Sequence, residues 1–249
     1  MANDPMAAFV VKNVLPMELF GLDISITNSS LYMFLVVLLV CALFWIGTSD
    51  RGLVPGKIQC VLEKLFSFTR DVVNTNAGAR GAVLFPYLFA LFLFIAFGNV
   101  VGLFPFAFSF TSQLVVTVGM AVVVFVSSIV IGLFAQGLGF FQRFCPSGIP
   151  GYLIPFFIVI ELMSFLFRPL SLGIRLFANM VSGHIMIDVI AGFAASIAGV
   201  VAVSFLAVVP VAVDVLLNVF KLVVCMLQAY VFTVLSCMYL SESLEAPAH

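Results

Sequence analysis

Long runs of apolar residues, separated by short polar segments, dominate the sequence. Five such runs occupy residues 31–48, 84–104, 114–135, 153–199 and 200–240. Each is close to or longer than the roughly 20 residues that an α-helix needs to cross a bilayer. Charged residues make up 8% of the 249-residue chain, too few to cover the surface of a soluble fold of this size. The sequence therefore predicts an all-α integral membrane protein with about five membrane helices.

The predicted architecture is a single membrane domain covering residues 1–249. Its parts are an external N-terminal segment (1–30), a first span (31–48), a cytoplasmic amphipathic segment (49–82), two spans (84–135), a cytoplasmic turn (136–152) and a long helix pair (153–240). Segment 49–82 has apolar residues at roughly helical spacing and holds five of the ten Lys and Arg residues. We therefore expect an interfacial helix there, on the cytoplasmic side.

The last two apolar runs are too long to cross a membrane upright. As one helix, run 153–199 would be about 70 Å long, roughly twice the hydrocarbon thickness. It must either break near Pro169 or Gly173, or lie strongly tilted. The last run is of similar length, and we expect it to return antiparallel, with the C-terminal residues, including Glu242, in the cytoplasm.

Polar residues inside these two runs recur at steps of three or four, which places them on one face of each helix. The first polar stripe consists of Glu161, Ser164, Arg168, Ser171, Arg175, Asn179 and Ser182, and His184 and Asp188 follow it. The second polar stripe consists of Asp214, Asn218, Lys221, Cys225 and Gln228.

Charges in such segments need an explanation, because one at the bilayer centre costs about 2.5–3.5 kcal/mol on insertion scales. The stripes can face a water-filled path, each other, or a charge on a partner. Simpler explanations exist for some members: Glu161 and Arg168 can snorkel to an interface, and Asp214 and Lys221 can form a structural salt bridge. Arg175 lies about 22 residues into its run, among apolar residues, and is the hardest to explain by structure alone.

Other classes of protein find little support. The five Cys residues show no C-x-x-C spacing and the two His residues are 65 positions apart, so we expect no metal site and no cofactor. A net charge of -1 gives no basic surface for nucleic acid. The main alternative is a secondary ion transporter with a midplane charged site, although no inverted repeat is visible. No motif for an intramembrane enzyme occurs, and a membrane anchor would not need two polar stripes.

Several motifs together resemble the a subunit of the membrane sector of rotary ATP synthases. The longest runs from Glu161-Leu-Met-Ser164 through Arg168-Pro-Leu-Ser-Leu-Gly-Ile-Arg175-Leu-Phe-Ala-Asn179 to Gly183-His184. Gln228-Ala-Tyr-Val-Phe232 is similar to the C-terminal motif of that family, and Gly98-Asn99-Val-Val-Gly-Leu-Phe-Pro105 to an earlier one. Asn28, before the first span, also fits, so the resemblance covers nearly the whole chain.

The resemblance implies two long tilted helices packed against a ring of c subunits, with a role for each stripe. Arg175 corresponds to the essential arginine of the family, which faces the carboxylate of each passing c subunit and separates two aqueous half-channels. Positions near the cytoplasmic half-channel are Glu161, Ser164 and Ser171. Positions near the arginine and the external half-channel are Asn179, His184 and Gln228.

Two positions depart from the family pattern. Lys221 stands where the family usually has Glu or His, and Asp188 where many relatives have His. Our hypothesis is a charge swap in which Asp188, together with Asp214, pairs with Lys221. We therefore include all three residues in the expected proton path.

The resemblance also implies partners and a location. These partners are the c-ring, the b subunits of the peripheral stalk, the soluble F1 sector through the complex, the lipid bilayer and protons. The expected location is a bacterial inner membrane, with the mitochondrial inner membrane as the alternative. The chain would hold no catalytic site itself but would belong to a proton-translocating rotary ATP synthase. The sequence leaves proton or sodium coupling open.

Overall fold

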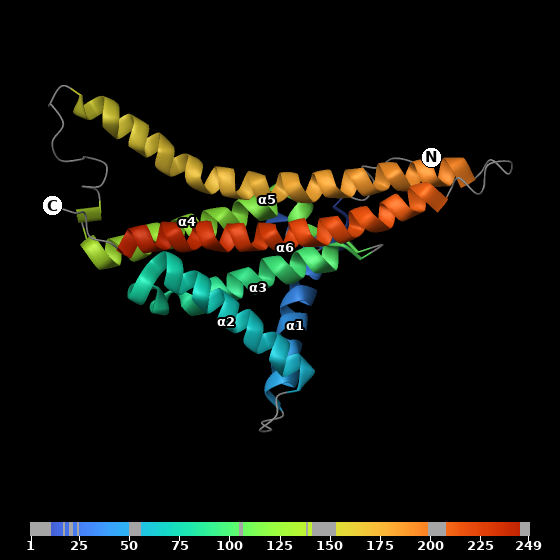
Figure 1. Ribbon diagram of the computed structural model, residues 1–249. Helices are drawn as coiled ribbons and strands as arrows, with labels where there is room; N and C mark the ends of the chain where they lie inside the picture. The colour runs from blue at the N-terminus through green and yellow to red at the C-terminus, as the bar shows by residue number, and fades with distance from the viewer. Residues whose placement is uncertain are drawn as a thin grey trace. The chain divides into compact units, whose positions relative to one another are not determined.

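Six α-helices form most of the computed structural model, which describes residues 11–16, 18–19, 22–23, 25–49, 56–104, 107–137, 139–140, 153–198 and 208–244. The helices are α1 (Asn28–Ser49), α2 (Lys57–Ala77), α3 (Phe85–Gly102), α4 (Leu114–Gln136), α5 (Ile154–Ala198) and α6 (Val208–Leu244) (Figure 1). Two 3-10 helices, η2 (Gly78–Val83) and η3 (Phe110–Ser112), precede α3 and α4. Of the predicted turn at 136–152, residues 141–152 lie outside the described residues, as do residues 199–207 between the two long helices.

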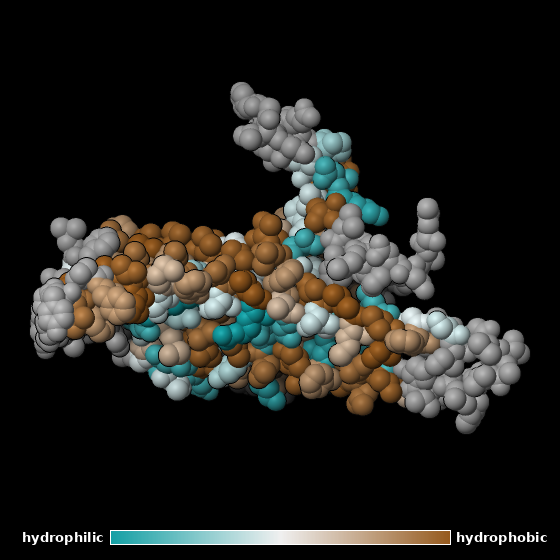
Figure 2. Space-filling view, turned by 90° about the horizontal axis from the view of Figure 1, so that it is seen from above, coloured by the Kyte–Doolittle hydropathy of each residue, from teal (hydrophilic) through white to brown (hydrophobic). Residues whose placement is uncertain are grey.

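Five of the described helices are long and apolar enough to cross a membrane: α1, α3, α4, α5 over Phe156–Phe193 and α6 over Ala212–Leu244. Large apolar side chains such as Phe34, Phe134 and Leu216 are more than half exposed, and Figure 2 shows brown, apolar residues over much of the visible surface. Such a surface suits hydrocarbon and not water. The predicted all-α membrane protein with five spans is confirmed, and the chain is a multi-pass membrane protein.

Helix α5 is continuous over 45 residues, with Pro169 inside it, and Figure 1 draws it as one unbroken ribbon. The predicted alternative of a break near Pro169 or Gly173 is therefore wrong. Proline removes one backbone hydrogen bond, but membrane helices tolerate it where neighbouring groups satisfy the freed carbonyl. Both residues are buried against the chain, which favours continuity through this region. Helix α6 is also longer than expected at its C-terminal end, because it runs to Leu244.

The chain forms two compact units, and helices α3, α5 and α6 contribute to both. The first unit comprises Met1–Arg51, Leu93–Gln113 and Leu176–Ala229, and the second comprises Gly52–Phe92, Leu114–Arg175 and Tyr230–His249. The single membrane domain of the sequence analysis stays a prediction.

In the first unit, short strands hold the N-terminal segment to the start of α1. Strand β1 (Asn13–Leu15) pairs antiparallel with β4 (Ile26–Thr27), and β2 (Glu18–Leu19) with β3 (Leu22–Asp23). The amide of Asn28 donates to the carbonyl of Lys12 over 3.1 Å, and the amide of Lys12 donates to Oδ1 of Asn28 over 3.1 Å. The first turn of α1 is thus fixed by backbone bonds to the preceding segment.

In the second unit, α2 has the amphipathic pattern expected for segment 49–82. Its buried residues are Leu62, Thr69, Val72 and Val73, while all its Lys, Arg, Asp and Glu side chains are exposed. Gly78, with φ of 56°, ends the helix in a conformation that favours glycine. Its buried face joins a core formed by Val73, Leu84, Leu88, Cys237 and Leu240, so α2 packs against α3 and the last turns of α6.

Candidate functional site

Helix α5 presents the N-terminal half of the first polar stripe at its surface, within the second unit. Ser164, Ser171 and Arg175 are exposed, and Glu161 is half-buried. The hydroxyl of Ser171 donates to the carbonyl of Arg168 over 3.0 Å, which leaves its oxygen able to accept another hydrogen bond. The predicted residues of the cytoplasmic side therefore share one accessible helix face.

Arg175 is an exposed charged residue on this face of α5. It makes no hydrogen bond or ion pair with any residue in the described part of the chain. Its neighbours Leu170 and Ile174 are apolar and more than 40% exposed. A guanidinium stays charged at any working pH, so this exposed position can accept a carboxylate as a partner.

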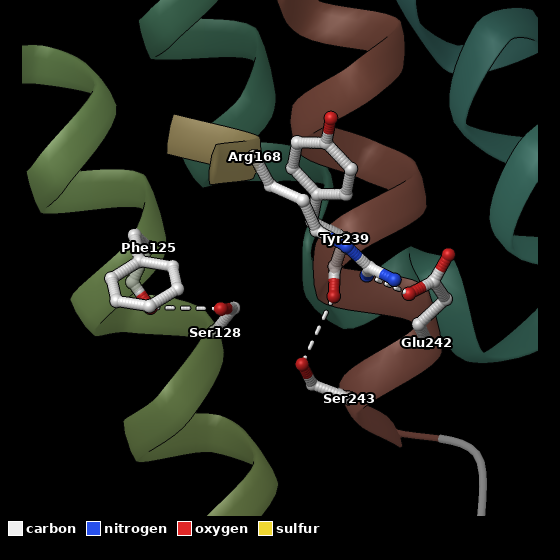
Figure 3. Close-up of polar contacts among 6 residues, drawn as sticks. All are labelled: Phe125, Ser128, Arg168, Tyr239, Glu242 and Ser243. Atoms are coloured by element: carbon white, nitrogen blue, oxygen red, sulfur yellow. Dashed lines mark hydrogen bonds and ion pairs between the residues drawn. The ribbon is translucent and has the colours of Figure 1, made fainter. Parts of the chain in front are cut away.

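Arg168, two turns earlier, has partners within the second unit. Its Nη1 forms an ion pair with Oε2 of Glu242, and its guanidinium carbon lies 5.5 Å from the ring centroid of Tyr239 and 5.9 Å from that of Phe165. Figure 3 shows the guanidinium beside the Glu242 carboxylate, with the Tyr239 ring close to both. The sequence analysis missed Glu242 as a partner, because it placed Glu242 beyond the last helix. The signal that could have found it is that Glu242 lies within one helical turn of the end of the apolar run 200–240.

The second polar stripe is largely buried in the first unit. Lys221, Cys225 and Gln228 are 5%, 1% and 7% exposed, and Asp214 and Asn218 are half-buried. The amide of Asn218 donates to the carbonyl of Asp214 over 2.9 Å and lies 3.4 Å from its Oδ2. All five members thus follow one another along α6 in buried or half-buried positions.

Helices α5 and α6 run antiparallel in this unit, as predicted. Sγ of Cys225 lies 3.4 Å from Sδ of Met180. Three residues further along α5, a Cβ on Gly183 would lie 3.0 Å from Cε of Lys221, four residues earlier on α6. The absence of a side chain at Gly183 therefore makes room for the lysine stem.

Several buried polar atoms in the first unit have no hydrogen-bond partner among the described residues: Asn99 Oδ1, Asn179 Nδ2, Asp214 Oδ1 and Gln228 Nε2. Asn99 uses its other amide atom, Nδ2, to donate to the carbonyl of Cys225 over 3.1 Å. Buried polar atoms without partners are rare in folded proteins. This group offers the donors and acceptors that a chain of water molecules requires. The sequence analysis quoted Asn99 in a motif without giving it a role.

The expected pairing of Lys221 with aspartates is not made at contact distance. Neither Asp188 nor Asp214 forms an ion pair with Lys221 within 4.0 Å in the described residues, although Asp188 lies within electrostatic range of both Lys221 and Asp214. His184 is half-buried on the same part of α5. The charge swap stays a hypothesis about electrostatic balance and not about a direct salt bridge.

Comparison with known proteins was made for the whole chain. A family model described as ATP synthase A chain matches residues 30–241. Similar curated proteins include an ATP synthase subunit a from Chelativorans sp. (strain BNC1), 45% identical over all of both chains, and one from Agrobacterium fabrum, 43% identical over 98% of this chain and 99% of the relative. An ATP synthase subunit a 1 from Brucella anthropi is 42% identical over all of both chains.

Proposed function

Because this chain belongs to the ATP synthase A chain family, we propose that it is the stator subunit of an ATP synthase proton channel. In this role it couples transmembrane proton flow to rotation of a c-ring and thereby to ATP synthesis. Moving one proton through about 100 mV yields about 2.3 kcal/mol, so several protons are needed for each ATP. A rotating carrier that collects protons one at a time meets that need.

The observation that carries the proposal is the exposed guanidinium of Arg175, which has no ion pair among the described residues, within a largely apolar membrane helix. A nearby cation favours the ionised form of a carboxyl group. A ring carboxylate that reaches Arg175 therefore releases its proton on one side, passes the arginine ionised, and takes up a proton on the other side. The same charge opposes direct passage of protons between the two sides.

Two groups of residues would form the half-channels on either side of Arg175. On the cytoplasmic side, Glu161, Ser164 and Ser171 offer polar groups on the accessible face of α5. On the external side we propose Asn179, His184, Asp188, Asp214, Lys221 and Gln228. Support for the external group comes from the burial of Lys221 and Gln228 in one unit, and from the atoms of Asn179, Asp214 and Gln228 that have no hydrogen-bond partner among the described residues.

The proposed partners follow from this role. The c-ring would contact the Arg175 face of α5, and the b subunits and soluble F1 sector would complete the complex. A bacterial inner membrane is the proposed location, since the similar proteins reported above come from bacteria. The alternative of a secondary ion transporter loses support, because the family match covers most of the chain.

Replacement of Arg175 by alanine tests the proposal. In inverted membrane vesicles that contain the complete complex, we expect Arg175→Ala to abolish ATP-driven acidification while the amount of assembled complex stays near normal. Arg70→Ala is the matched control, because Arg70 is an exposed arginine of α2, outside the predicted spans. Acidification at the wild-type rate in the Arg175→Ala vesicles would refute the mechanism.

A further inference from the structure

Two arginines occupy the same face of α5 but differ in their surroundings. Arg168 and Arg175 are seven residues apart, which separates them by about 10 Å along the helix axis and by nearly two full turns. Both guanidinium groups stay charged at any working pH. Without further partners, the face would present two equivalent cations.

Glu242 removes this equivalence. Its carboxylate forms an ion pair with Arg168, whose guanidinium also lies over the rings of Phe165 and Tyr239 (Figure 3). Arg175 has no ion pair within the described part of the chain. The pair is close to neutral as a whole, so the free positive charge on this face is concentrated at Arg175.

Attachment of the α6 end does not require the Arg168–Glu242 pair. Cys237 and Leu240 are fully buried in the core with Leu88 of α3 and its neighbours. Nε2 of Gln136 on α4 also donates to the carbonyl of Ser243 over 2.9 Å. The ion pair itself is partly exposed, with side chains 27% and 39% accessible, and exposed pairs contribute little to stability. A purely structural role therefore explains the pair poorly.

We propose that Glu242 is a positioning residue for proton transfer: it neutralises Arg168, so that the ring carboxylate meets a free guanidinium at Arg175 alone. This inference rests on the proposed function, because it requires that a carboxylate passes this face. Without Glu242, Arg168 becomes a second free cation two turns away. It favours the ionised form of the carboxylate at a second position along α5 and slows rotation.

Three variants of the complete complex test this inference in the vesicle assay, with acidification normalised to the amount of assembled complex. Glu242→Gln should lower ATP-driven acidification by roughly fivefold or more, within the range of coupled pairs. The double variant Arg168→Gln/Glu242→Gln should recover to within about twofold of wild type, as should Arg168→Gln alone, since neither has a second free cation. If the ion pair served only to hold the helices together, the double variant would acidify the vesicles no faster than Glu242→Gln.

The controls separate charge from folding. Glu63→Gln removes one carboxylate from α2, where its oxygen accepts a hydrogen bond from Gln59 over 2.8 Å, and should leave acidification unchanged. Glu242→Asp keeps the charge and should restore most of the activity. Acidification by Glu242→Gln at the wild-type rate, its failure to assemble, or a double variant as slow as Glu242→Gln would each overturn the inference. If Arg175→Ala still abolishes acidification in that case, the proposed function survives and only the role of Glu242 is lost.

Discussion

Helix α5 lies against the backbone of α4 at Gly173, and replacement of this glycine by alanine tests the contact. A Cβ on Gly173 would lie 2.8 Å from Cα of Val118 and 3.1 Å from the carbonyl oxygen of Thr117. Both atoms belong to the α4 backbone, so neither can rotate away as a flexible side chain would. The first distance is about 0.6 Å short of the 3.4 Å at which ordinary contact begins. Gly173→Ala therefore requires the two helices to separate locally.

The cost follows from two opposing effects. Adding one methyl group to a filled interface costs about 1–3 kcal/mol, whereas alanine in place of glycine inside a helix gains about 1 kcal/mol. Gly119→Ala on α4 isolates the second effect, because nothing lies within 4 Å of a Cβ at that position. Since both variants gain the same helix propensity, the difference between them should equal the overpacking cost of about 1–3 kcal/mol.

Thermal unfolding of the purified complex in detergent measures this difference, and the vesicle assay measures its effect on function. At about 2–4 °C per kcal/mol for a chain of this size, Gly173→Ala should melt several degrees below Gly119→Ala. Acidification should also fall, because Arg175 lies two residues further on the displaced helix and an error of about 1 Å in a reacting group can cost about 100-fold. Equal melting temperatures for the two variants would refute the reasoning from the helix contact.

Three further substitutions have definite expected outcomes. Lys221→Met keeps the stem against Gly183 and removes a buried ammonium that has no ion pair among the described residues. Thermal unfolding should show unchanged or higher stability, by up to about 3 kcal/mol, while proton flux falls, and a loss of stability would indicate a counter-ion. Phe66→Leu removes edge contacts to the rings of Phe85 and Phe89, 4.8 and 5.6 Å away. This substitution should lower the free energy of unfolding by about 1–3 kcal/mol. An unchanged value would mean that these ring contacts do not stabilise the protein. Gln136→Ala removes the hydrogen bond to the Ser243 carbonyl and should cost about 0.5–1.5 kcal/mol, to be checked by comparing its unfolding midpoint with that of the wild type; equal midpoints would contradict the expectation.

The helices themselves were predictable because apolar runs and spans coincide in a membrane protein. Run 114–135 matches α4 at Leu114–Gln136, and run 84–104 contains α3 at Phe85–Gly102. The continuity of α5 was not predictable, since Pro169 is an ordinary sign of a helix break. The packing of its neighbours decides that point, and a single sequence does not reveal packing.

The candidate site was predicted unevenly. Spacing alone placed Lys221 and Gln228 on one face, and both are buried in the same unit. Spacing also grouped Arg168 with Arg175, but it did not reveal that, within the described residues, only Arg168 has an ion pair. That difference depends on Glu242, which is 74 positions from Arg168 in sequence and becomes its neighbour only through the fold.

The core shared by α2 and the end of α6 has a consequence for biosynthesis. Val73 of α2 is made well before its core neighbours Cys237 and Leu240, which follow it by more than 160 positions in the sequence. While the intervening residues are being translated, the apolar face of α2 must contact something other than this core. The lipid headgroup boundary can accommodate an amphipathic helix of this kind. A chain that ended before Cys237 would therefore leave the apolar face of α2 without these two core neighbours.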